Sequence, residues 1–231
     1  MRISVIMPVL NEEQIVGKSL SHAMSLSLDE VIVVDGSSRD RTRDVVTSLI
    51  KTSTGNVSLL IASPGRACQM NAGAAISHGD VLVFLHADTQ LPLNARGQIE
   101  QALVNPAFVG GRFDVQFEPE TGWGRVISHM MNWRSRWSGI ATGDQAIFVR
   151  RECFEQLGGF SDLPIMEDID FTRRLKRAGR MAALRSTVVT SYRRWEQRGP
   201  LTTIALMWLL RALYWLGISP HALTRMYGHV R

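Results

Sequence analysis

Four short apolar runs alternate with helix-like stretches along the first hundred residues, at residues 3–9, 31–34, 58–62 and 81–85. Each run is largely continuous in its apolar character, which is typical of strands buried on both faces of a parallel sheet. The stretches between them, residues 12–26, 42–50 and 68–77, predict helices. This order predicts an α/β fold with a mixed, mostly parallel central sheet, helices on both faces and right-handed crossovers.

The pattern changes after residue 104. Residues 112–117 alternate between apolar and polar side chains, which predicts a strand in a mixed sheet, and residues 146–149 predict another short strand. The stretch 122–143 is rich in Trp, Arg and Gly and predicts a helix with mobile flanks over the site. Residues 168–177 predict a helix that ends at Gly179.

The C-terminal part contains an apolar stretch, residues 201–218, whose only charged residue is Arg211. Pro200 before it and Gly217 near its end predict a helix. Tryptophans in the helix and arginines beside it fit an amphipathic helix lying at a membrane surface. Packing against the domain or a second copy of the chain in a homodimer is the alternative. A membrane-spanning helix would need about 20 apolar residues and no central arginine.

Composition excludes several classes of protein. Two cysteines, Cys68 and Cys153, are too few for a disulfide scaffold and lack the spacing of a zinc site, so a reducing cytoplasm is expected. The net charge is +5, but the basic residues are scattered, which argues against nucleic acid as a partner. The apolar N-terminus has no small-residue cleavage site and is interpreted as a strand, not as a signal peptide.

Polar residues follow each of the first four predicted strands. They are Glu12, Asp35, Arg66 and the pair His86 and Asp88. The carboxyl ends of parallel strands meet at one sheet edge, where such folds bind ligands, so these side chains predict a shared site. The first turn lacks the glycine-rich dinucleotide fingerprint, which argues against a nicotinamide dehydrogenase.

His86 and Asp88 are two residues apart at a strand end, so their side chains project to the same side. The pair can hold a divalent cation on a diphosphate. Imidazole together with carboxylate favours Mn²⁺ over Mg²⁺, which prefers oxygen ligands. The alternative is that Asp88 caps the following turn and His86 only packs.

Two further carboxylate groups can act on a substrate. Asp35 can accept hydrogen bonds from a ribose or a nucleobase, or it can simply form an Asp-Gly turn. Glu167, Asp168 and Asp170 surround a helix start, which the helix dipole alone favours. Neighbouring carboxylates can also raise one another's pKa and leave one of them as a general base.

Aromatic and basic residues supply candidate contacts to the acceptor or the diphosphate. Trp133 and Trp137 share one face of the predicted helix, where they form either a stacking platform for the acceptor or a core-facing pair. Arg193, Arg194 and Trp195 either close over the diphosphate or form a basic collar above the C-terminal helix.

Several strings taken together show a family resemblance that covers residues 1–190. They are Met7-Pro-Val-Leu-Asn-Glu12, Val34-Asp-Gly-Ser-Ser38, Gly65-Arg-Ala-Cys-Gln-Met-Asn-Ala-Gly73, Phe84-Leu-His-Ala-Asp88, Thr142-Gly-Asp-Gln145 and Glu167-Asp168. With these strings the chain resembles the inverting, family-2-type glycosyltransferases of the GT-A fold. The third string and Arg193-Arg-Trp-Glu-Gln-Arg-Gly199 more narrowly resemble a bacterial subgroup. Its members are labelled as associated with radical-SAM or selenium-linked genes or with arsenosugar biosynthesis.

The resemblance implies a role for each matching residue. Asp35 would hold the uridine, Pro8 and Glu12 would line the base pocket, and Arg66 would lie near the base or the diphosphate. Asn71 would contact the donor. Asp88 would be the metal-binding carboxylate, with His86 beside it, and Asp168 would be the catalytic base. Asp144, Gln145 and Glu167 would contact the acceptor or the diphosphate. Two positions depart from the family pattern, because Val34 and His86 each stand where an aspartate is common.

The resemblance implies a division into a nucleotide-sugar glycosyltransferase domain at residues 1–190 and a basic collar with a hydrophobic helix at 191–231. The expected activity is metal-assisted transfer of a sugar from a nucleotide diphosphate sugar, with UDP preferred, to an unidentified hydroxyl or phosphate acceptor. The expected location is the cytoplasm, on the inner face of the plasma membrane. The alternatives are a nucleotidyltransferase and a catalytically silent, membrane-associated nucleotide-binding module.

Overall fold

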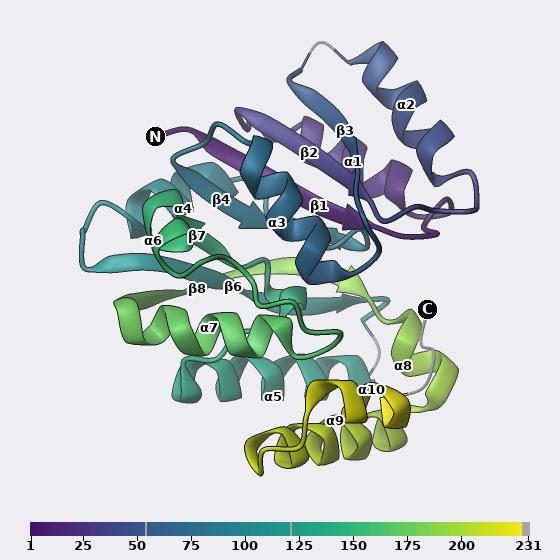
Figure 1. The fold of residues 1–231 in the computed structure, drawn as a ribbon, viewed down its shortest axis with the longest axis vertical. Helices are drawn as coiled ribbons and strands as arrows, with labels where there is room; N and C mark the ends of the chain where they lie inside the picture. Colours follow the sequence, from purple (N-terminus) through teal and green to yellow (C-terminus); the bar gives the residue numbers. More distant parts are fainter. Residues whose placement is uncertain (54, 121, 228–231) are drawn as a thin grey trace.

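The computed structural model describes residues 1–53, 55–120 and 122–227, with the side chain of Arg194 outside the described part. Within that part, eight strands form one sheet in the order β3-β2-β1-β4-β7-β6-β8-β5 (Figure 1). The strands are β1 (Ile3–Val9), β2 (Glu30–Asp35), β3 (Val57–Ile61), β4 (Val81–Phe84), β5 (Thr89–Gln90), β6 (Phe108–Glu118), β7 (Phe148–Arg150) and β8 (Arg180–Ser191). β1 pairs in parallel with β2 and β4, whereas β7 is antiparallel to β4 and β6. The mixed, mostly parallel sheet predicted from the sequence is confirmed.

Helices cover both faces of the sheet. They are α1 (Val16–Met24), α2 (Thr42–Thr52), α3 (Arg66–Ile76), α4 (Ala95–Ala102), α5 (Gly122–Ser138), α6 (Arg151–Gln156), α7 (Glu167–Ala178), α8 (Arg193–Arg198), α9 (Pro200–Trp215) and α10 (Pro220–Tyr227), with a short 3-10 turn η1 (Gly143–Gln145). Side chains alternate across each strand, so Val5 packs into one core with Leu20 of α1 and Ile6 into the other with Met70 of α3. The continuous apolar runs therefore reflect burial on both sides.

Several helix boundaries differ from the sequence prediction, and at two of them a glycine is the reason. The helix predicted at residues 122–143 ends at Ser138, because Gly139 takes a left-handed conformation (φ 69°) that breaks the helical path. The chain then forms a loop and η1. The helix predicted at residues 201–218 ends at Trp215, before Gly217 (φ 88°), and a separate helix, α10, folds back against it.

A cluster of four phenylalanines joins the end of β4 to α6 and α7. Its members are Phe84, Phe154, Phe160 and Phe171, with ring centroids 4.4 Å apart for the closest pair, Phe160 and Phe171. Phe171 is fully buried on α7. Because offset and edge-to-face aromatic pairs add to the free energy of burial, this cluster fixes where α7 begins relative to the sheet.

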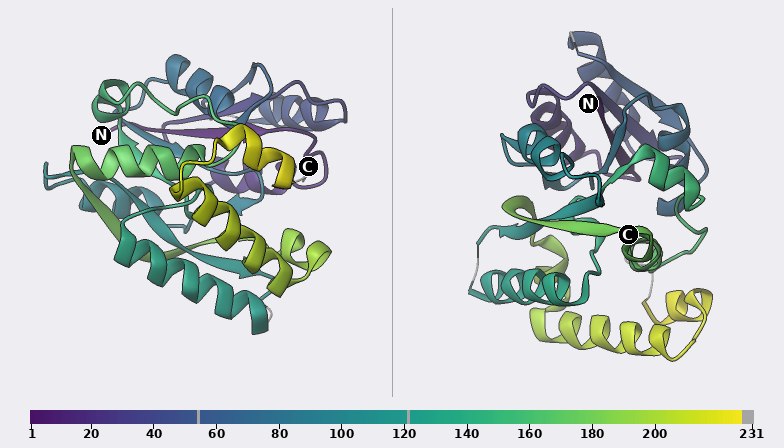
Figure 2. Two further views of the ribbon diagram at one scale, coloured as in Figure 1. Left: turned by 60° about the horizontal axis from the view of Figure 1, so that its bottom comes forward. Right: turned by 90° about the vertical axis from the view of Figure 1, so that its left-hand side faces the viewer.

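The C-terminal helices pack on the rest of the chain. α9 runs beside α5, and both lie away from the β1–β3 half of the sheet (Figures 1 and 2). Tyr192, Phe117 and Ile127 form a small core there, against which Trp195 and Ile204 pack. The predicted C-terminal helix therefore exists and buries one side against the domain. In the described ranges, no helix combines the length and the hydrophobicity that crossing a bilayer requires.

Candidate active site

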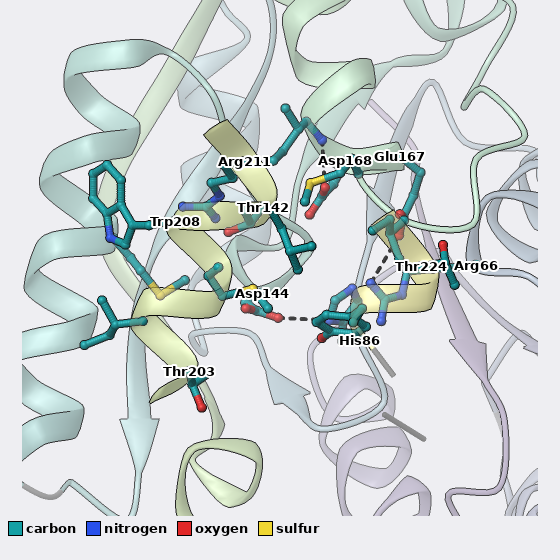
Figure 3. Close-up of a pocket in the computed structure, with 18 of the residues that line it drawn as sticks. Arg66, His86, Thr142, Asp144, Glu167, Asp168, Thr203, Trp208, Arg211 and Thr224 are labelled. Atoms are coloured by element: carbon teal, nitrogen blue, oxygen red, sulfur yellow. Dashed lines mark hydrogen bonds and ion pairs between the residues drawn. The ribbon is translucent and has the colours of Figure 1, made fainter. Parts of the chain in front are cut away.

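A cavity of about 480 Å³ lies between the ends of the central strands, the start of α7 and the helices α5, α9 and α10. Its volume is in the range of small-molecule sites in proteins. Figure 3 shows polar side chains from several elements pointing into it. The polar lining comprises Arg66, His86, Thr142, Asp144, Glu167, Asp168, Arg134 and Arg211. The apolar lining includes Ile127, Met130, Met131, Ile204, Met207, Trp208 and Leu210.

Asp168 is the second residue of α7 and is held by two backbone N–H groups. Gly143 donates to its Oδ2 at 2.8 Å, and Ile169 donates to its Oδ1 at 2.7 Å. The helix start also favours a negative charge at this position. Each carboxylate oxygen can accept more than one hydrogen bond, so Asp168 can still take a proton from a hydroxyl in the cavity.

Beside Asp168, Glu167 forms an ion pair with Arg66, whose Nη1 lies 3.1 Å from Oε1 of Glu167. Burial raises the pKa of Glu167; the guanidinium of Arg66 opposes that rise, and the charge of Asp168 adds to it. Arg66 is the first residue of α3, so the pair connects α3 to α7 across 101 residues of sequence. The mutual effect of neighbouring carboxylates expected from the sequence contributes through Asp168, but burial is the larger cause.

His86 follows β4 and contacts Asp144 of η1, with Nδ1 3.3 Å from Oδ1. Its Nε2 is buried and has no hydrogen-bond partner among the described residues. A side chain at Gly143 would clash with the His86 ring, so glycine is required there by close approach. The sequence motif around residues 142–145 therefore brings η1 against the end of β4.

Asp88 lies two residues beyond His86 and is absent from the cavity lining that the structure describes. Its Oδ1 accepts a hydrogen bond from the Thr89 hydroxyl at 3.3 Å. Within residues 1–53, 55–120 and 122–227, no three His, Cys, Asp or Glu side chains cluster closely enough to hold a metal ion alone. The assignment of His86 and Asp88 as metal ligands stays a prediction.

Asp35 ends β2 and is fully buried. Its Oδ2 accepts from the backbone N–H of Ser38 at 2.9 Å and lies 3.9 Å from Nε of Arg43. Its Oδ1 has no partner among the described residues. Burying an unsatisfied carboxylate oxygen is costly, so this atom is suited to accept a hydrogen bond from a water or a bound molecule.

The other residues assigned to the donor lie near β1 and α3. Pro8 is in β1, in register with Val34. Glu12 lines a smaller pocket of about 200 Å³ with Arg193, whose Nη2 is 3.3 Å from Oε2 of Glu12. The loop after β1 and the start of α8 therefore meet here. The assignment of Pro8 and Glu12 to the base stays a prediction.

Two amides of the motifs hold the backbone instead of facing the cavity. Asn71 donates to the carbonyl of Phe160 at 2.8 Å and accepts from its N–H at 2.9 Å. Gln145 is fully buried and accepts from the N–H of Thr142 at 3.3 Å. Their contacts to donor or acceptor stay predictions, but both have a structural role that accounts for their presence.

The tryptophans of α5 are exposed. Trp133 and Trp137 stack in parallel, with centroids 6.4 Å and planes 4° apart, and are 65% and 81% exposed. The alternative of a core-facing pair is therefore wrong. Neither ring lines the cavity, whereas Trp195 does. The side chain of Arg194 lies outside the described residues.

Two arginines of the cavity were missed by the sequence analysis. Nε and Nη2 of Arg134 are buried without a hydrogen-bond partner in the described chain. Burial lowers the pKa of Arg134 to about 10 and also lowers the pKa of Arg211. For Arg211 a signal existed, since a lone arginine in an apolar helix needs a polar environment. Nothing distinguished Arg134 from its neighbouring arginines.

Comparison with known proteins shows which family the chain belongs to. The sequence profile described as glycosyl transferase family 2 matches residues 4–160, which is more than half of the chain. The chain belongs to glycosyl transferase family 2. The resemblance to this family, which the motifs predicted, is therefore confirmed.

Relatives of known sequence carry similar descriptions. A probable glycosyltransferase of Bacillus subtilis, YdaM, is 29% identical over 217 residues, 85% of this chain and 50% of the relative. A beta-monoglucosyldiacylglycerol synthase of Synechocystis is 24% identical over 197 residues, 75% of this chain and 40% of the relative. The chain thus spans about half the length or less of these relatives.

Solved structures show the same fold at low identity. The mannosyltransferase PcManGT of Pyrobaculum calidifontis, in complex with GDP-Man and Mn²⁺, superposes with a TM-score of 0.67 at 22% identity, over 81% of this chain and 56% of that one. Staphylococcus aureus TarS 1–349 with UDP-GlcNAc gives 0.65 at 17% identity, over 83% and 58%. The chain therefore has a GT-A-like fold, as expected.

Proposed function

We propose that this glycosyltransferase moves a sugar from a nucleotide diphosphate sugar to a hydroxyl acceptor with inversion at the anomeric carbon, and that Asp168 is the base. One observation carries the proposal: two backbone N–H groups orient the Asp168 carboxylate at the wall of a cavity of about 480 Å³. A positioned carboxylate of this kind is what removal of a hydroxyl proton requires.

The donor is proposed to bind along the sheet edge that includes Asp35. The buried, unpartnered Oδ1 of Asp35 is suited to accept the N–H of a uracil ring, which supports UDP as the nucleotide. Two fold neighbours were solved with nucleotide sugars, one with GDP-Man and one with UDP-GlcNAc. Both nucleotides therefore belong in the first panel of substrates.

Transfer proceeds by a single displacement in this proposal. The acceptor oxygen attacks the anomeric carbon while its proton passes to Asp168. The bond between that carbon and the diphosphate oxygen breaks, and the diphosphate leaves with the electron pair. Attack opposite to the leaving group inverts the configuration, and the base contributes about 10²–10⁴-fold to the rate.

The leaving diphosphate needs positive charge, which Arg66 supplies from the first turn of α3. Asp88 and His86 would hold a divalent cation, Mn²⁺ or Mg²⁺, together with the diphosphate, and the buried unpartnered Nε2 of His86 fits this role. When bound, such a cation neutralises the developing charge on the leaving group. The Mn²⁺ in the PcManGT complex supports its inclusion in assays.

The C-terminal part, residues 191–231, is proposed to place the enzyme on a membrane surface at the cytoplasmic face. Apolar side chains are exposed along α5 and α9, among them Trp137, Leu201 and Trp215. Tryptophan beside arginine is typical of interfacial helices. Partition to vesicles of anionic lipid tests this, with Leu201→Glu in α9 expected to reduce it. A homodimer through the same face would instead appear as a doubled mass in solution.

The narrower relationship, to the subgroup associated with radical-SAM, selenium-linked or arsenosugar genes, is also kept as a proposal. It rests on the strings at residues 65–73 and 193–199. Turnover of an arsenic- or selenium-bearing acceptor, and of no plain alcohol, would support it.

The reaction is tested by incubating the protein with Mn²⁺ and a panel of UDP- and GDP-sugars. Release of the nucleoside diphosphate, with the sugar in water or on an added acceptor, supports the proposed function. Release of pyrophosphate would indicate a nucleotidyltransferase. Nucleotide binding without any turnover would indicate a silent binding module.

A further inference from the structure

The half of the cavity formed by α5 and α9 has a chemical character that sugar transfer alone does not require. Arg134 of α5 and Arg211 of α9 both line it. Nε and Nη2 of Arg134 are buried and unpartnered, and the described residues offer Arg211 neither a hydrogen bond nor an ion pair. Figure 3 shows Arg211 on the same side of the cavity as Asp168 and Thr142.

Two guanidinium groups at one cavity, of which Arg134 has two buried and unpartnered nitrogens, are costly to keep charged without an anion nearby. Burial, together with the nearby charge of Arg211, lowers the pKa of Arg134 to about 10. Asp168 and Asp144 act in the opposite direction on both arginines. An uncompensated buried charge is destabilising, so an anion bound beside these arginines would stabilise them.

The remaining wall of this half is apolar. Ile127, Met130, Ile204, Met207 and Trp208 line it from α5 and α9. Met130 and Trp208 are also 44% and 54% exposed, so the cavity reaches the molecular surface between them. An apolar chain can therefore leave the cavity there and continue over the exposed apolar residues of both helices, such as Trp133 and Leu209.

We propose that the acceptor is an anionic amphiphile: a molecule whose phosphate or carboxylate group is held by Arg134 and Arg211 and whose apolar part lies between α5 and α9. Its reacting hydroxyl then faces Asp168. This inference rests on the proposed function, because it assigns the acceptor to the same cavity. Guanidinium groups suit both anions, since their planar forks pair with carboxylate and phosphate oxygens.

The donor diphosphate is the competing occupant of the arginine pair. Other residues are candidates for binding the diphosphate: Arg66 begins α3, and His86 and Asp88 follow β4 at the sheet edge. Arg134 and Arg211 instead lie on α5 and α9, two helices outside the sheet edge. Separate measurements of nucleotide binding and of amphiphile binding therefore distinguish the two assignments.

The experiment measures binding by the intact chain with tryptophan fluorescence and calorimetry, since Trp195 and Trp208 line the cavity. The probes are octyl phosphate, octanoate, octyl glucoside and inorganic phosphate; UDP and GDP are measured in parallel. The variants are Arg134→Met, Arg211→Met and the double substitution. Arg185→Met, at an exposed position of β8, is the matched control.

We expect octyl phosphate or octanoate to bind at least about tenfold more tightly than octyl glucoside and inorganic phosphate. Each methionine variant should lose about tenfold of that affinity, whereas the control and the affinity for UDP or GDP stay unchanged. The variants should melt no lower than the parent, because methionine removes an unpaired buried charge without leaving a cavity.

Three outcomes overturn the inference. The first is that octyl phosphate and octanoate bind the double variant as tightly as they bind the parent. The second is that inorganic phosphate binds as tightly as either amphiphile. The third is that the variants lose affinity for the nucleotide and not for the amphiphile. The last result would assign the arginines to the donor. Failure of the proposed function is a different observation, namely no nucleotide-sugar binding or turnover by the parent protein.

Discussion

The backbone N–H of Gly143 donates a hydrogen bond of 2.8 Å to Oδ2 of Asp168. Gly143 begins η1, and Asp168 lies in the first turn of α7, so this bond joins two segments 25 residues apart. The next residue, Asp144, contacts His86 at the end of β4. One short turn thus positions the proposed base and a proposed metal ligand relative to each other.

Gly143→Ala should disrupt this arrangement. An added Cβ would clash with the ring of His86, and overpacking of this kind costs about 1–3 kcal/mol. We expect glycosyl transfer to fall about tenfold to a hundredfold, since small displacements of reacting groups have effects of that size. The steady-state rate of glycosyl transfer measures this loss. Gly97→Ala is the control, because the position is open and lies within α4; it should keep activity and melt at the same temperature or higher. Equal activity of the two variants would contradict the geometry.

Glu167→Gln should change how stability depends on pH. Burial raises the pKa of Glu167 above 4.5, so the folded protein keeps this proton to higher pH than the unfolded chain does. The stabilising effect of the protonated form is present below pH 4.5 and is lost as pH rises through the folded pKa. Urea unfolding between pH 4 and pH 8 should therefore show the parent losing stability relative to the variant as pH rises. Glu155→Gln, at an exposed position, should give no such difference. A difference of opposite slope would refute the raised pKa.

Asn71→Ala should lower the free energy of unfolding by about 1–3 kcal/mol, because both backbone groups of Phe160 lose their partner. Denaturant titration measures this. Nucleotide affinity, measured on the same variant, separates the structural role from the predicted donor contact. If stability is unchanged and nucleotide binding is weakened, Asn71 binds the nucleotide sugar and does not stabilise the fold through the backbone of Phe160.

Removal of metal should weaken donor binding. Calorimetry with UDP- or GDP-sugar is expected to show tighter binding with Mn²⁺ than with a chelator, and Asp88→Asn should reduce the gain about tenfold or more. Asp162→Asn, at an exposed position, is the control. Identical affinity with Mn²⁺ and with chelator would remove the cation from the proposed function.

Local patterns were sufficient to predict the first half of the fold. The apolar runs ending in Asp35 and His86 are strands β2 and β4 with their polar ends at one edge, because period and strand termination are local properties of a sequence. The position of Asp168 at the start of a helix was also predictable, since acidic residues are favoured in the first turn of a helix. These features need no knowledge of long-range packing.

Contacts between distant segments were not predictable from the sequence. Arg134 and Arg211 meet at one cavity only because α9 returns beside α5, and Asn71 holds the backbone of Phe160 across 89 residues. Trp133 and Trp137 share a helix face as predicted, but whether that face is buried depends on what packs against α5. Tertiary arrangement decides each of these cases.

The most direct test of the proposed reaction is the rate of glycosyl transfer by Asp168→Asn, measured together with its affinity for the nucleotide. The asparagine keeps the size of the side chain but cannot take up the acceptor proton. We predict a fall in transfer rate of about 10²–10⁴-fold with nucleotide affinity unchanged. Transfer at the rate of the parent protein would contradict the assignment of Asp168 as the base.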